Sequence, residues 1–558
     1  MITVAKRQIR VDTRTLIAVF ESGALISLVR KSDKRRLIAA KASGQFSPLQ
    51  LVFPNNELAS LSGNPGDCVT VVRLNDCRAQ FRFESWHGDG ILDIQEDALS
   101  GEVVVEPSAY SSRPGLVACR WNISGIDRAL ELVAPFFQGI RLSLEDSLIH
   151  NTRWHWPHLW EASLAILQGR DGGFSIHSQD TQYRYKALQV GTPGNAYCIG
   201  LDSEEYGPID GNLGAGGIAW RVNVHSGGWE IPAGRYRDWL SSAWAIGKAE
   251  RPQWVHGLRF AISWCPTNAN ILKALAKRLD PRKVLLHVPD WRQDKYDEGY
   301  PRYAASRAGA AFVRKAQAMG FHAMPHFNSI DMDPTHPAYT YLRDFQYRDL
   351  ISKSVQGWTW TKLHLPVPES NSARLKHRSE KTMVKIHPGL AMWRSILAEN
   401  VLAAAEALSL DAVFLDVTLC TWNLHNCLVE NETPSEGMCR LIEAVRGLGK
   451  GLAVGGEGRN ETTFRGESFG QVHLFKSWGR TNFEGLERAG GTPLCEFLFG
   501  RTCRSFGYTG LSGRNRDEEV RMKLHVSLGA MPTVTIRSEA EIENPNKMVK
   551  EMLRLANE

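Results

Sequence analysis

Two acidic residues in the second half of the sequence each close a short apolar run, and they are the first candidates for catalysis. Asp416 ends the run Asp411-Ala-Val-Phe-Leu-Asp416, and Glu457 ends the run Gly451-Leu-Ala-Val-Gly-Gly-Glu457. A carboxylate is costly to bury in such a place unless it is paired or does chemistry. A retaining glycosidase uses two carboxyl groups about 5–5.5 Å apart, one as nucleophile and the other as acid/base.

The two residues lie 41 positions apart (457 − 416), enough for one loop, one helix and one strand. Neighbouring parallel strands are joined by such a crossover and lie about 5 Å apart, so the spacing predicts that the two carboxyl groups meet. Each acid alone also has a structural interpretation, as a helix cap or as the partner of an arginine. Glu496, which we expect at the end of a later strand, is a rival to Glu457 as the acid/base.

Segments that follow other predicted strands carry acids and aromatic rings suited to sugars. Asp290–Pro301 combines carboxylates, which accept hydrogen bonds from hydroxyl groups, with Trp and Tyr rings, which pack on the C–H faces of a sugar. The stretch from Asp333 to His387 is too long for a simple loop and indicates a lid. The residues that we expect to bind substrate are Trp291, Asp297, Asn328, Trp358, Trp360, Lys476, Trp478 and Glu496.

A metal site is the alternative for His322 and His326, which lie on the same side of a predicted strand. No third ligand follows at a recognisable spacing, and the ten cysteines form neither a Cys-x-x-Cys pair nor a zinc-finger pattern with histidine. The sequence therefore predicts chemistry that needs no metal and no organic cofactor.

The hydrophobic pattern from residue 251 onward predicts the scaffold that positions these residues. Short apolar runs alternate with amphipathic segments such as Ala304–Met319 and Ala391–Leu408. Eight buried strands with intervening helices predict a (β/α)8 TIM barrel, whose C-terminal strand ends carry the active site. A doubly wound open sheet is disfavoured because no glycine-rich phosphate loop follows the first strand. The predicted strands are Leu258–Trp264, Val284–Val288, His322–Phe327, Ala412–Val417, Leu452–Gly455, Val472–Phe475, Leu494–Phe499 and Thr533–Ile536.

The first part of the chain has a different pattern, dominated by short strands. Thr15–Phe20 and Ala24–Val29 flank Glu21-Ser22-Gly23, which is a hairpin signal. The fold class is thus all-β plus α/β, with an N-terminal β-sandwich in residues 1–250 and a barrel in residues 251–558. The other predicted strands of the sandwich include Val103–Val105, Leu116–Ile123, Phe174–His177, Thr181–Tyr185 and Ile218–Val224.

Composition restricts the partners. The 558 residues carry a net charge of +6, and the one dense basic run, Arg30–Arg36, is expected as a solvated loop, so a nucleic-acid partner is not predicted. No stretch reaches eighteen apolar residues, and the first ten residues lack the apolar core of a signal peptide, which predicts a cytoplasmic protein unless an export signal was trimmed. Seventeen Trp residues, several of them clustered, fit either sugar binding or core packing.

The strand-end motifs Phe-Leu-Asp416-Val and Gly-Gly-Glu457-Gly together resemble the catalytic pair of endo-α-N-acetylgalactosaminidases and related α-galactosidase-like glycoside hydrolases. The pattern from Ala18 to Leu28 and the run Arg235–Trp239 before the barrel are similar to the same group, which heads a TIM barrel with a β-sandwich.

The resemblance implies that Asp416 is the nucleophile and Glu457 the acid/base of a retaining α-glycosidase for a galactose-type or N-acetylgalactosamine-type sugar. It also implies that Asp297 binds sugar hydroxyl groups and that Trp358 and Trp360 cover the substrate. The large extracellular enzymes of that group carry export signals and accessory sugar-binding modules, which this sequence does not show. A smaller imported oligosaccharide or glycoside is therefore the expected partner, in place of a mucin-type glycopeptide.

Two other functions use the same residues. A glycan-binding protein or a transglycosylase could be built on this scaffold, although paired carboxylates argue against binding alone. A lyase or isomerase using His473 and Lys476 would act without cleaving a glycosidic bond, and the lack of a phosphate or metal pattern disfavours it.

Overall fold

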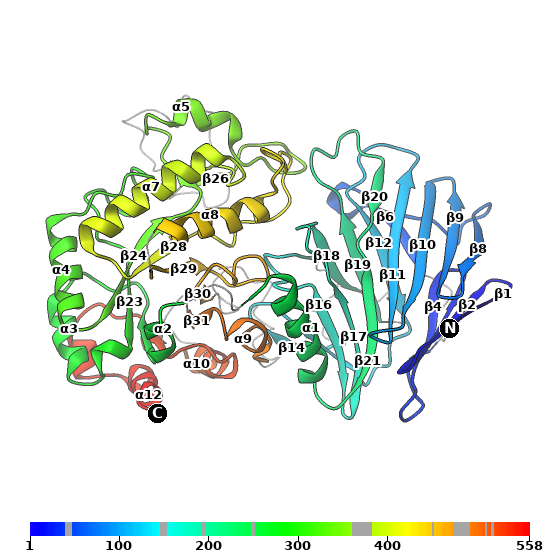
Figure 1. Cartoon of the computed structure of the whole chain (residues 1–558), viewed down its shortest axis with the longest axis horizontal. Coiled ribbons are helices and arrows are strands. Elements are labelled where there is room, and N and C mark those ends of the chain that lie inside the picture. The colour runs from blue at the N-terminus through cyan, green and yellow to red at the C-terminus, as the bar shows by residue number, and fades with distance from the viewer. Residues whose placement is uncertain are drawn as a thin grey trace. The chain divides into compact units, whose positions relative to one another are not determined.

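The chain forms two compact units in the computed structural model. One consists of residues 1–243 with 488–494, and the other of residues 244–487 with 495–558 (Figure 1). The structure describes residues 1–39, 47–145, 153–191, 197–246, 251–359, 382–448, 451–472, 491–507, 511–514 and 518–558.

The first unit is a sandwich of antiparallel sheets, as predicted. Its described strands form a five-stranded sheet (β1-β2-β3-β4-β5), a ten-stranded sheet (β14-β13-β16-β17-β21-β11-β10-β9-β8, with β20 on β11) and a six-stranded sheet (β15-β18-β19-β12-β6-β7). Strand β11 of the ten-stranded sheet contacts β12 and β6 of the six-stranded sheet, so the two sheets pack on each other. The strands are β1 (Ile2–Ala5), β2 (Gln8–Asp12), β3 (Leu16–Glu21), β4 (Ala24–Arg30), β5 (Arg35–Ala39), β6 (Leu49–Val52), β7 (Leu58–Ser60), β8 (Cys68–Asn75), β9 (Arg78–Ser85), β10 (Gly88–Asp97), β11 (Glu102–Ser111), β12 (Ala118–Ser124), β13 (Glu131–Ala134), β14 (Ile140–Ser143), β15 (Arg153–His155), β16 (Leu164–Gly169), β17 (Gly172–Ser178), β18 (Lys186–Gly191), β19 (Cys198–Glu204), β20 (Gly214–Gly216) and β21 (Trp220–Ser226); one helix, α1 (Glu230–Ala243), follows.

Large aromatic side chains fill the core of this unit. Trp160 stacks on Trp220 with ring centroids 6.1 Å apart, and Trp154 stacks on Phe136 at 4.3 Å. All four rings are buried, as is Trp156. Core packing therefore accounts for the tryptophan cluster at 154–160, and the structure offers none of these rings as a surface for a sugar.

The second unit is a parallel eight-stranded barrel, again as predicted. Its described strands follow the order β31-β30-β29-β28-β24-β23-β22-β32. A parallel bridge between Phe506 and Met531 joins the two ends of this order, with the Met531 N–H donating to the Ser505 carbonyl at 2.8 Å. The strands are β22 (Phe260–Ile262), β23 (Val284–Val288), β24 (His322–Asn328), β28 (Ala412–Asp416), β29 (Ala453–Glu457), β30 (Phe469–Val472), β31 (Arg504–Gly507) and β32 (Thr533–Val534).

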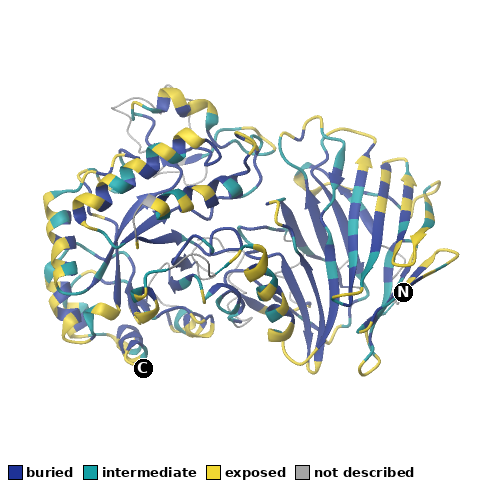
Figure 2. Cartoon of the chain, viewed as in Figure 1, coloured by how far each residue is buried: buried dark blue, intermediate teal, exposed yellow. Residues whose placement is uncertain are grey.

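Helices cover the outside of the barrel and bury one face against it. Figure 2 shows the barrel strands in dark blue and helices such as α4 and α7 with exposed residues along one side. Helix α4 buries Phe312 and Val313 and contacts β24, which is the amphipathic arrangement that its sequence predicts. The helices are α2 (Trp254–Gly257), α3 (Ala269–Ala276), α4 (Arg307–Ala318), α5 (Tyr339–Leu342), α7 (Ala391–Leu408), α8 (Pro434–Leu448), α9 (Leu494–Phe499), α10 (Glu518–Ser527), α11 (Ala540–Glu543) and α12 (Lys547–Ala556).

A small antiparallel sheet extends from the excursion after β24. Its order is β25 (Asp331–Met332), β27 (Thr382–Lys385) and β26 (Gly357–Thr359), and residues 360–381 lie outside the described residues. The long segment after β24 thus contains a folded element, and this element brings Lys385 opposite Asp331 in register.

Three strand predictions are wrong in position. Leu494–Phe499 is helix α9, and the seventh strand is β31, so Glu496 does not end a strand. A run of six apolar residues shows no periodicity, so its sequence does not distinguish a buried strand from a short helix. The sixth strand, β30, begins at Phe469, before the predicted start at Val472, and residues 473–475 of the predicted run lie outside the described residues. Residues 181–185 precede β18 as a loop in which the Arg184 N–H donates to Asp180.

Candidate active site

The inside of the barrel has an apolar layer and, two residues further along each strand, a polar layer. Side chains at positions i and i+2 of a strand lie on the same face. The buried apolar cluster contains Ala261, Leu285, Met324, Phe414, Ala453 and Phe469. Two residues after these, counting through Gly455 on β29, come the six side chains that we call the polar layer: Ser263, His287, His326, Asp416, Glu457 and Gln471.

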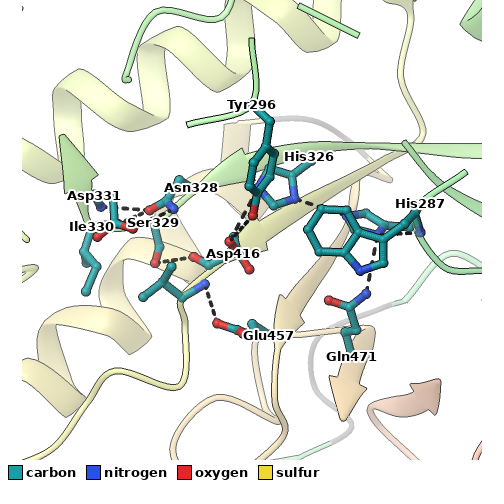
Figure 3. A network of polar contacts seen from close by, with 12 residues as sticks. His287, Tyr296, His326, Asn328, Ser329, Ile330, Asp331, Asp416, Glu457 and Gln471 are labelled. Carbon is teal, nitrogen blue, oxygen red and sulfur yellow. Dashed lines mark hydrogen bonds and ion pairs between the residues drawn. The ribbon is translucent and has the colours of Figure 1, made fainter. Parts of the chain in front are cut away.

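Hydrogen bonds across the barrel confirm that the polar layer points inward. Gln471 on β30 donates to the Ser263 hydroxyl at 2.9 Å and lies 3.4 Å from His287 Nδ1, although β30 is not a neighbour of β22 or β23 in the sheet. Figure 3 shows His287, His326, Asp416, Glu457 and Gln471 around one space at the strand ends. The C-terminal end of the barrel therefore carries the polar groups, where active sites of this fold lie.

Asp416 and Glu457 end adjacent parallel strands at the same height. The register pairs Leu415 with Gly456, so the next residues on the two strands stand opposite each other. The N–H of Val417, directly after Asp416, donates to Glu457 Oε2 at 3.1 Å. The Thr418 hydroxyl donates to the Glu457 carbonyl at 2.9 Å, so a single turn after β28 holds both ends of Glu457.

Val417 adopts a strained backbone conformation in this turn. Its φ is +65°, in the left-handed region that β-branched residues rarely occupy. Such strain costs on the order of 1–3 kcal/mol and persists where the surrounding structure imposes it, often at functional sites. Here the conformation directs the Val417 N–H toward the Glu457 carboxylate.

Asp416 lies in an acidic and largely buried environment. Its side chain is 11% exposed. Burial raises the pKa of Asp416 well above its ordinary value, and the nearby charges of Glu457, Asp297 and Asp331 raise it further. The Lys385 ammonium opposes this increase. Crowded carboxyl groups with strongly shifted pKa values are typical of sites that transfer protons or bind cationic intermediates.

Lys385 joins this acidic group through Asp331. Its Nζ lies 2.8 Å from Asp331 Oδ1, and both side chains are buried. Burial alone would lower the pKa of Lys385, but Asp331, together with Cys420 and Glu457, outweighs burial and raises it, so the lysine stays charged. Asn328 donates to Asp331 Oδ2 at 3.1 Å and so fixes the carboxylate from the other side.

Two further side chains contact the same oxygen of Asp416. The Tyr296 hydroxyl donates to Oδ2 at 3.4 Å, and His326 Nε2 lies 3.5 Å from it (Figure 3). His326 Nδ1 is 3.2 Å from His287 Nε2. Both of these contacts converge on Oδ2, and neither involves Oδ1.

Of the residues predicted to bind substrate, Asp297 lies at the site and contributes to its negative charge. It is 1% exposed, has φ +57°, and acts electrostatically on Asp416. Asn328 is buried and contacts Asp331, and its Oδ1 accepts from the N–H groups of Ile330 and Asp331. These contacts support Asp331, and a role of Asn328 in sugar binding stays a prediction.

Trp291 and Glu496 do not face the site. The Trp291 ring is fully buried and its indole N–H donates to the His326 carbonyl at 2.9 Å, so it forms part of the barrel wall. Glu496 lies on α9 and accepts from the buried Arg459 at 2.7 Å and from the Ser505 hydroxyl at 3.2 Å. An arginine partner is the structural interpretation of a lone acid, and it favours Glu457 over Glu496 as the acid/base.

The glycines before Glu457 make room for protein side chains. A Cβ at Gly456 would lie 1.8 Å from Glu467 Oε1 and 2.5 Å from the Thr418 hydroxyl. Glu467 is fully buried, and burial raises its pKa to about 8, which the hydroxyls of Thr418 and Thr463 partly oppose. A neutral buried carboxyl group therefore packs behind the strand that carries Glu457.

The remaining predicted residues are not placed at the site. Trp360, Lys476 and Trp478, together with His473, lie outside the described residues, and Trp358 is described only by its backbone in β26. His322 lies at the opposite end of β24 from His326 and pairs with Asp411 at 2.6 Å, which separates the two histidines of the metal alternative.

Sequence reasoning missed six residues of the site: Ser263, His287, Tyr296, Asp331, Lys385 and Gln471. His287 and Gln471 had a readable signal, because each stands two positions after an apolar interior residue of its strand. Tyr296 adjoins Asp297 within Asp290–Pro301, the segment whose acids and rings are expected to suit a sugar. Nothing local marks Lys385, which the small sheet brings to the site from 54 residues beyond Asp331 (385 − 331).

No helix within the described ranges has the length and apolar character to cross a membrane.

Comparisons with known proteins agree with this architecture. A family model described as a domain of unknown function (DUF6259) matches residues 218–474, which include β22–β30 and both strand-end acids. A sequence search of curated proteins finds no match.

Solved structures match over nearly the whole chain. The ligand-free α-N-acetylgalactosaminidase NagBb from Bifidobacterium bifidum superposes with a TM-score of 0.68 at 13% identity, covering 98% of this chain and 92% of that one. The GH36 α-galactosidase AgaA from Geobacillus stearothermophilus gives a TM-score of 0.50 at 10% identity, covering 99% and 86%. The predicted fold, a β-sandwich with a TIM barrel like that of α-galactosidase-like enzymes, is therefore confirmed.

Proposed function

We propose that this protein is a retaining α-glycoside hydrolase with Asp416 as nucleophile and Glu457 as acid/base. The observation that carries the proposal is the register-matched position of the two carboxyl groups, joined through the Val417 N–H. Adjacent parallel strands lie about 5 Å apart, which agrees with the short carboxyl separation of retaining enzymes.

In the first step Asp416 Oδ1 attacks the anomeric carbon, and the bond to the leaving oxygen breaks as Glu457 gives that oxygen its proton. In the second step Glu457 takes a proton from water, the water oxygen bonds to the anomeric carbon, and the Asp416 ester bond breaks. Each step inverts the anomeric configuration, so the released sugar retains it. Both groups end in their starting protonation states.

The charge of the site supports this chemistry. Glycoside cleavage passes through a transition state with positive charge on the sugar ring. Asp297, Asp331 and Asp416 surround the place where that charge develops, and preorganised carboxylates stabilise it without reorganising. Lys385 opposes the rise in the pKa of Asp416 and so favours the ionised form that attacks.

The substrate that we infer is an α-galactoside or an α-N-acetylgalactosaminide. The structural neighbours bear these activities in their names, and one NagBb structure is a complex with GalNAc. Asp297 would accept hydrogen bonds from sugar hydroxyl groups. Trp358, Trp360, Lys476 and Trp478 remain predicted substrate contacts.

A panel of aryl α- and β-glycosides tests the proposal. We expect hydrolysis of an α-galactoside-type member with retained configuration, measured by NMR of the first-formed anomer. Asp416→Gly should be inactive, and azide should restore release of the aryl group with a glycosyl azide of inverted configuration. Wild-type turnover surviving in Asp416→Asn would disprove the assignment of the nucleophile. Adding an acceptor sugar and analysing the products distinguishes hydrolysis from transglycosylation.

A further inference from the structure

A chain of neutral side chains runs from the backbone of Trp264 to Asp416. The Trp264 N–H points at His287 Nδ1 at 3.4 Å, and Gln471 Nε2 lies 3.4 Å from the same atom. His287 Nε2 is 3.2 Å from His326 Nδ1, and His326 Nε2 is 3.5 Å from Asp416 Oδ2. Figure 3 shows His326 between His287 and Asp416, with Gln471 beside His287.

The donors at the start of this chain fix where each proton lies. A backbone N–H can only donate, so His287 Nδ1 is an acceptor and the ring proton of His287 is on Nε2. That proton is donated to His326 Nδ1, which leaves the proton of His326 on Nε2. Both rings are buried, and burial lowers the pKa of His287 to about 3 and that of His326 well below its ordinary value, so each holds one proton only.

His326 Nε2 is a buried donor directed at the site. Among the described residues it makes no hydrogen bond, and Asp416 Oδ2 is the acid that it faces. An unsatisfied buried N–H costs on the order of 1–3 kcal/mol, which a short hydrogen bond to a carboxylate would recover. Contacts of this kind are often long in an empty active site and shorten when substrate binds.

We propose that His287 and His326 are positioning residues that aim a fixed N–H at Asp416 Oδ2. Together with the Tyr296 hydroxyl, this N–H holds Oδ2 and turns Oδ1 to the anomeric carbon. It also stabilises the carboxylate when the Asp416 ester breaks in the second step. This inference rests on the proposed function for its kinetic consequences, but the tautomers themselves do not depend on it.

Paired substitutions at one position isolate the contact. In a histidine site, the amide of Gln reaches the place of Nε2 and the amide of Asn the place of Nδ1. His326→Gln should keep a donor near Asp416, whereas His326→Asn should lose it. We expect kcat of His326→Asn to fall about 10- to 100-fold, as for a hydrogen bond to a charged group, with KM changed less than about threefold. His326→Gln should recover most of that loss.

The pH profile gives a readout that a packing defect would not change. Loss of a donor raises the pKa of a carboxyl group, so the acidic limb of kcat/KM should move to higher pH in His326→Asn by about one unit. The titratable and charged groups that face Asp416 are Glu457, Asp297, Asp331, Lys385, Tyr296 and His326. His525→Asn is the control, because it removes a buried donor, Nε2 of His525, from the Met531 carbonyl. This control variant should lower Tm and leave the acidic limb of kcat/KM at the same pH.

Nitrogen-15 NMR of histidine-labelled full-length protein tests the proton positions directly. The inference predicts that His287 and His326 carry their protons on Nε2 and none on Nδ1, with assignments from the His287→Phe and His326→Gln variants. A proton on Nδ1 of either ring overturns the inference even if the enzyme hydrolyses glycosides. An inactive wild type with the predicted tautomers would instead overturn the proposed function and leave the proton order standing. An equal loss of kcat in His326→Gln and His326→Asn, with an unmoved limb, also overturns it.

Discussion

Buried carboxyl groups occur in both units of the molecule, and their surroundings are opposite. In the sandwich, Asp202 is fully buried between Arg120, at 2.6 and 2.9 Å, and Arg153, at 2.6 Å. Burial alone would raise the pKa of Asp202, but the two arginines lower it to about 2. In the barrel, Asp416 is surrounded by other acids and its pKa is raised.

The difference separates structural acids from candidate catalytic acids. A buried carboxylate with arginine partners on two sides is neutralised and has no oxygen to offer a ligand. A carboxylate crowded by Glu457, Asp297 and Asp331 stores unfavourable energy that a cationic sugar intermediate would relieve. Glu496 shares with the first kind an arginine partner, Arg459, although its side chain is 31% exposed and it lies in the same unit as Asp416.

The largest expected effect is at Asp416. Asp416→Asn should lower kcat/KM by about 10⁴-fold or more, as expected for loss of a nucleophile. It should also raise the free energy of unfolding at pH 7, because it removes a buried charge that repels its neighbours. Steady-state kinetics and urea unfolding measure the two effects. If Asp416→Asn were both inactive and less stable, the contrast between Asp416 and a structural acid such as Asp202 would be contradicted.

Asp202→Asn should have the reverse profile. It leaves Arg120 and Arg153 buried without their shared carboxylate, so we expect the free energy of unfolding to fall by about 3–5 kcal/mol. The specific activity of the folded fraction should stay within about twofold of wild type. Urea unfolding and an active-site titration check this pair of outcomes, and a stable but inactive Asp202→Asn would contradict it.

The stability contributed by Glu467 should depend on pH, which gives a second test of the contrast between buried acids. Its folded pKa of about 8 lies above the ordinary value of 4.5, so the stability it contributes is complete below about pH 4.5 and is lost as pH rises through 8. The loss approaches about 1.4 kcal/mol per pH unit within that window. Glu467→Gln should flatten this decline in Tm measured from pH 5 to 9. Parallel Tm curves for the two proteins would show that Glu467 is ionised when folded.

Glu496→Gln should have the smallest effect. It weakens one charged hydrogen bond to Arg459, so we expect a loss of about 1–3 kcal/mol in stability and unchanged kcat on the best aryl glycoside. The matched variant Glu457→Gln should lose about 10²- to 10⁴-fold in kcat on substrates with poor leaving groups. If Glu496→Gln shows that loss instead, the two glutamates have been assigned in the wrong order.

The sequence predicts the scaffold well because the signals are periodic. Alternation of apolar runs and amphipathic segments predicts the barrel, and six of its eight strands lie at the predicted runs: β22, β23, β24, β28, β29 and β32. The later strands are short, and the run 494–499 is apolar in either helix or strand, so the pattern loses its period there.

The site is predicted only in part, for a physical reason. Asp416 and Glu457 stand out because each ends an apolar run, and that signal is local. Lys385 reaches the site through the pairing of β25 with β27, and no local pattern encodes such a pairing. Trp291 was misread because an aromatic ring in a loop suits a sugar and a barrel wall equally until its N–H partner is known.

The turn at Val417 has a consequence for how such a protein can evolve. The N–H that follows the candidate nucleophile holds the carboxyl group of the candidate acid/base, so the backbone of this turn helps to set the spacing of the two carboxyl groups. That spacing decides whether a released sugar keeps its configuration. Loops that line the barrel mouth can therefore vary and select new sugars, while the stereochemistry of the product is inherited with the backbone of one turn.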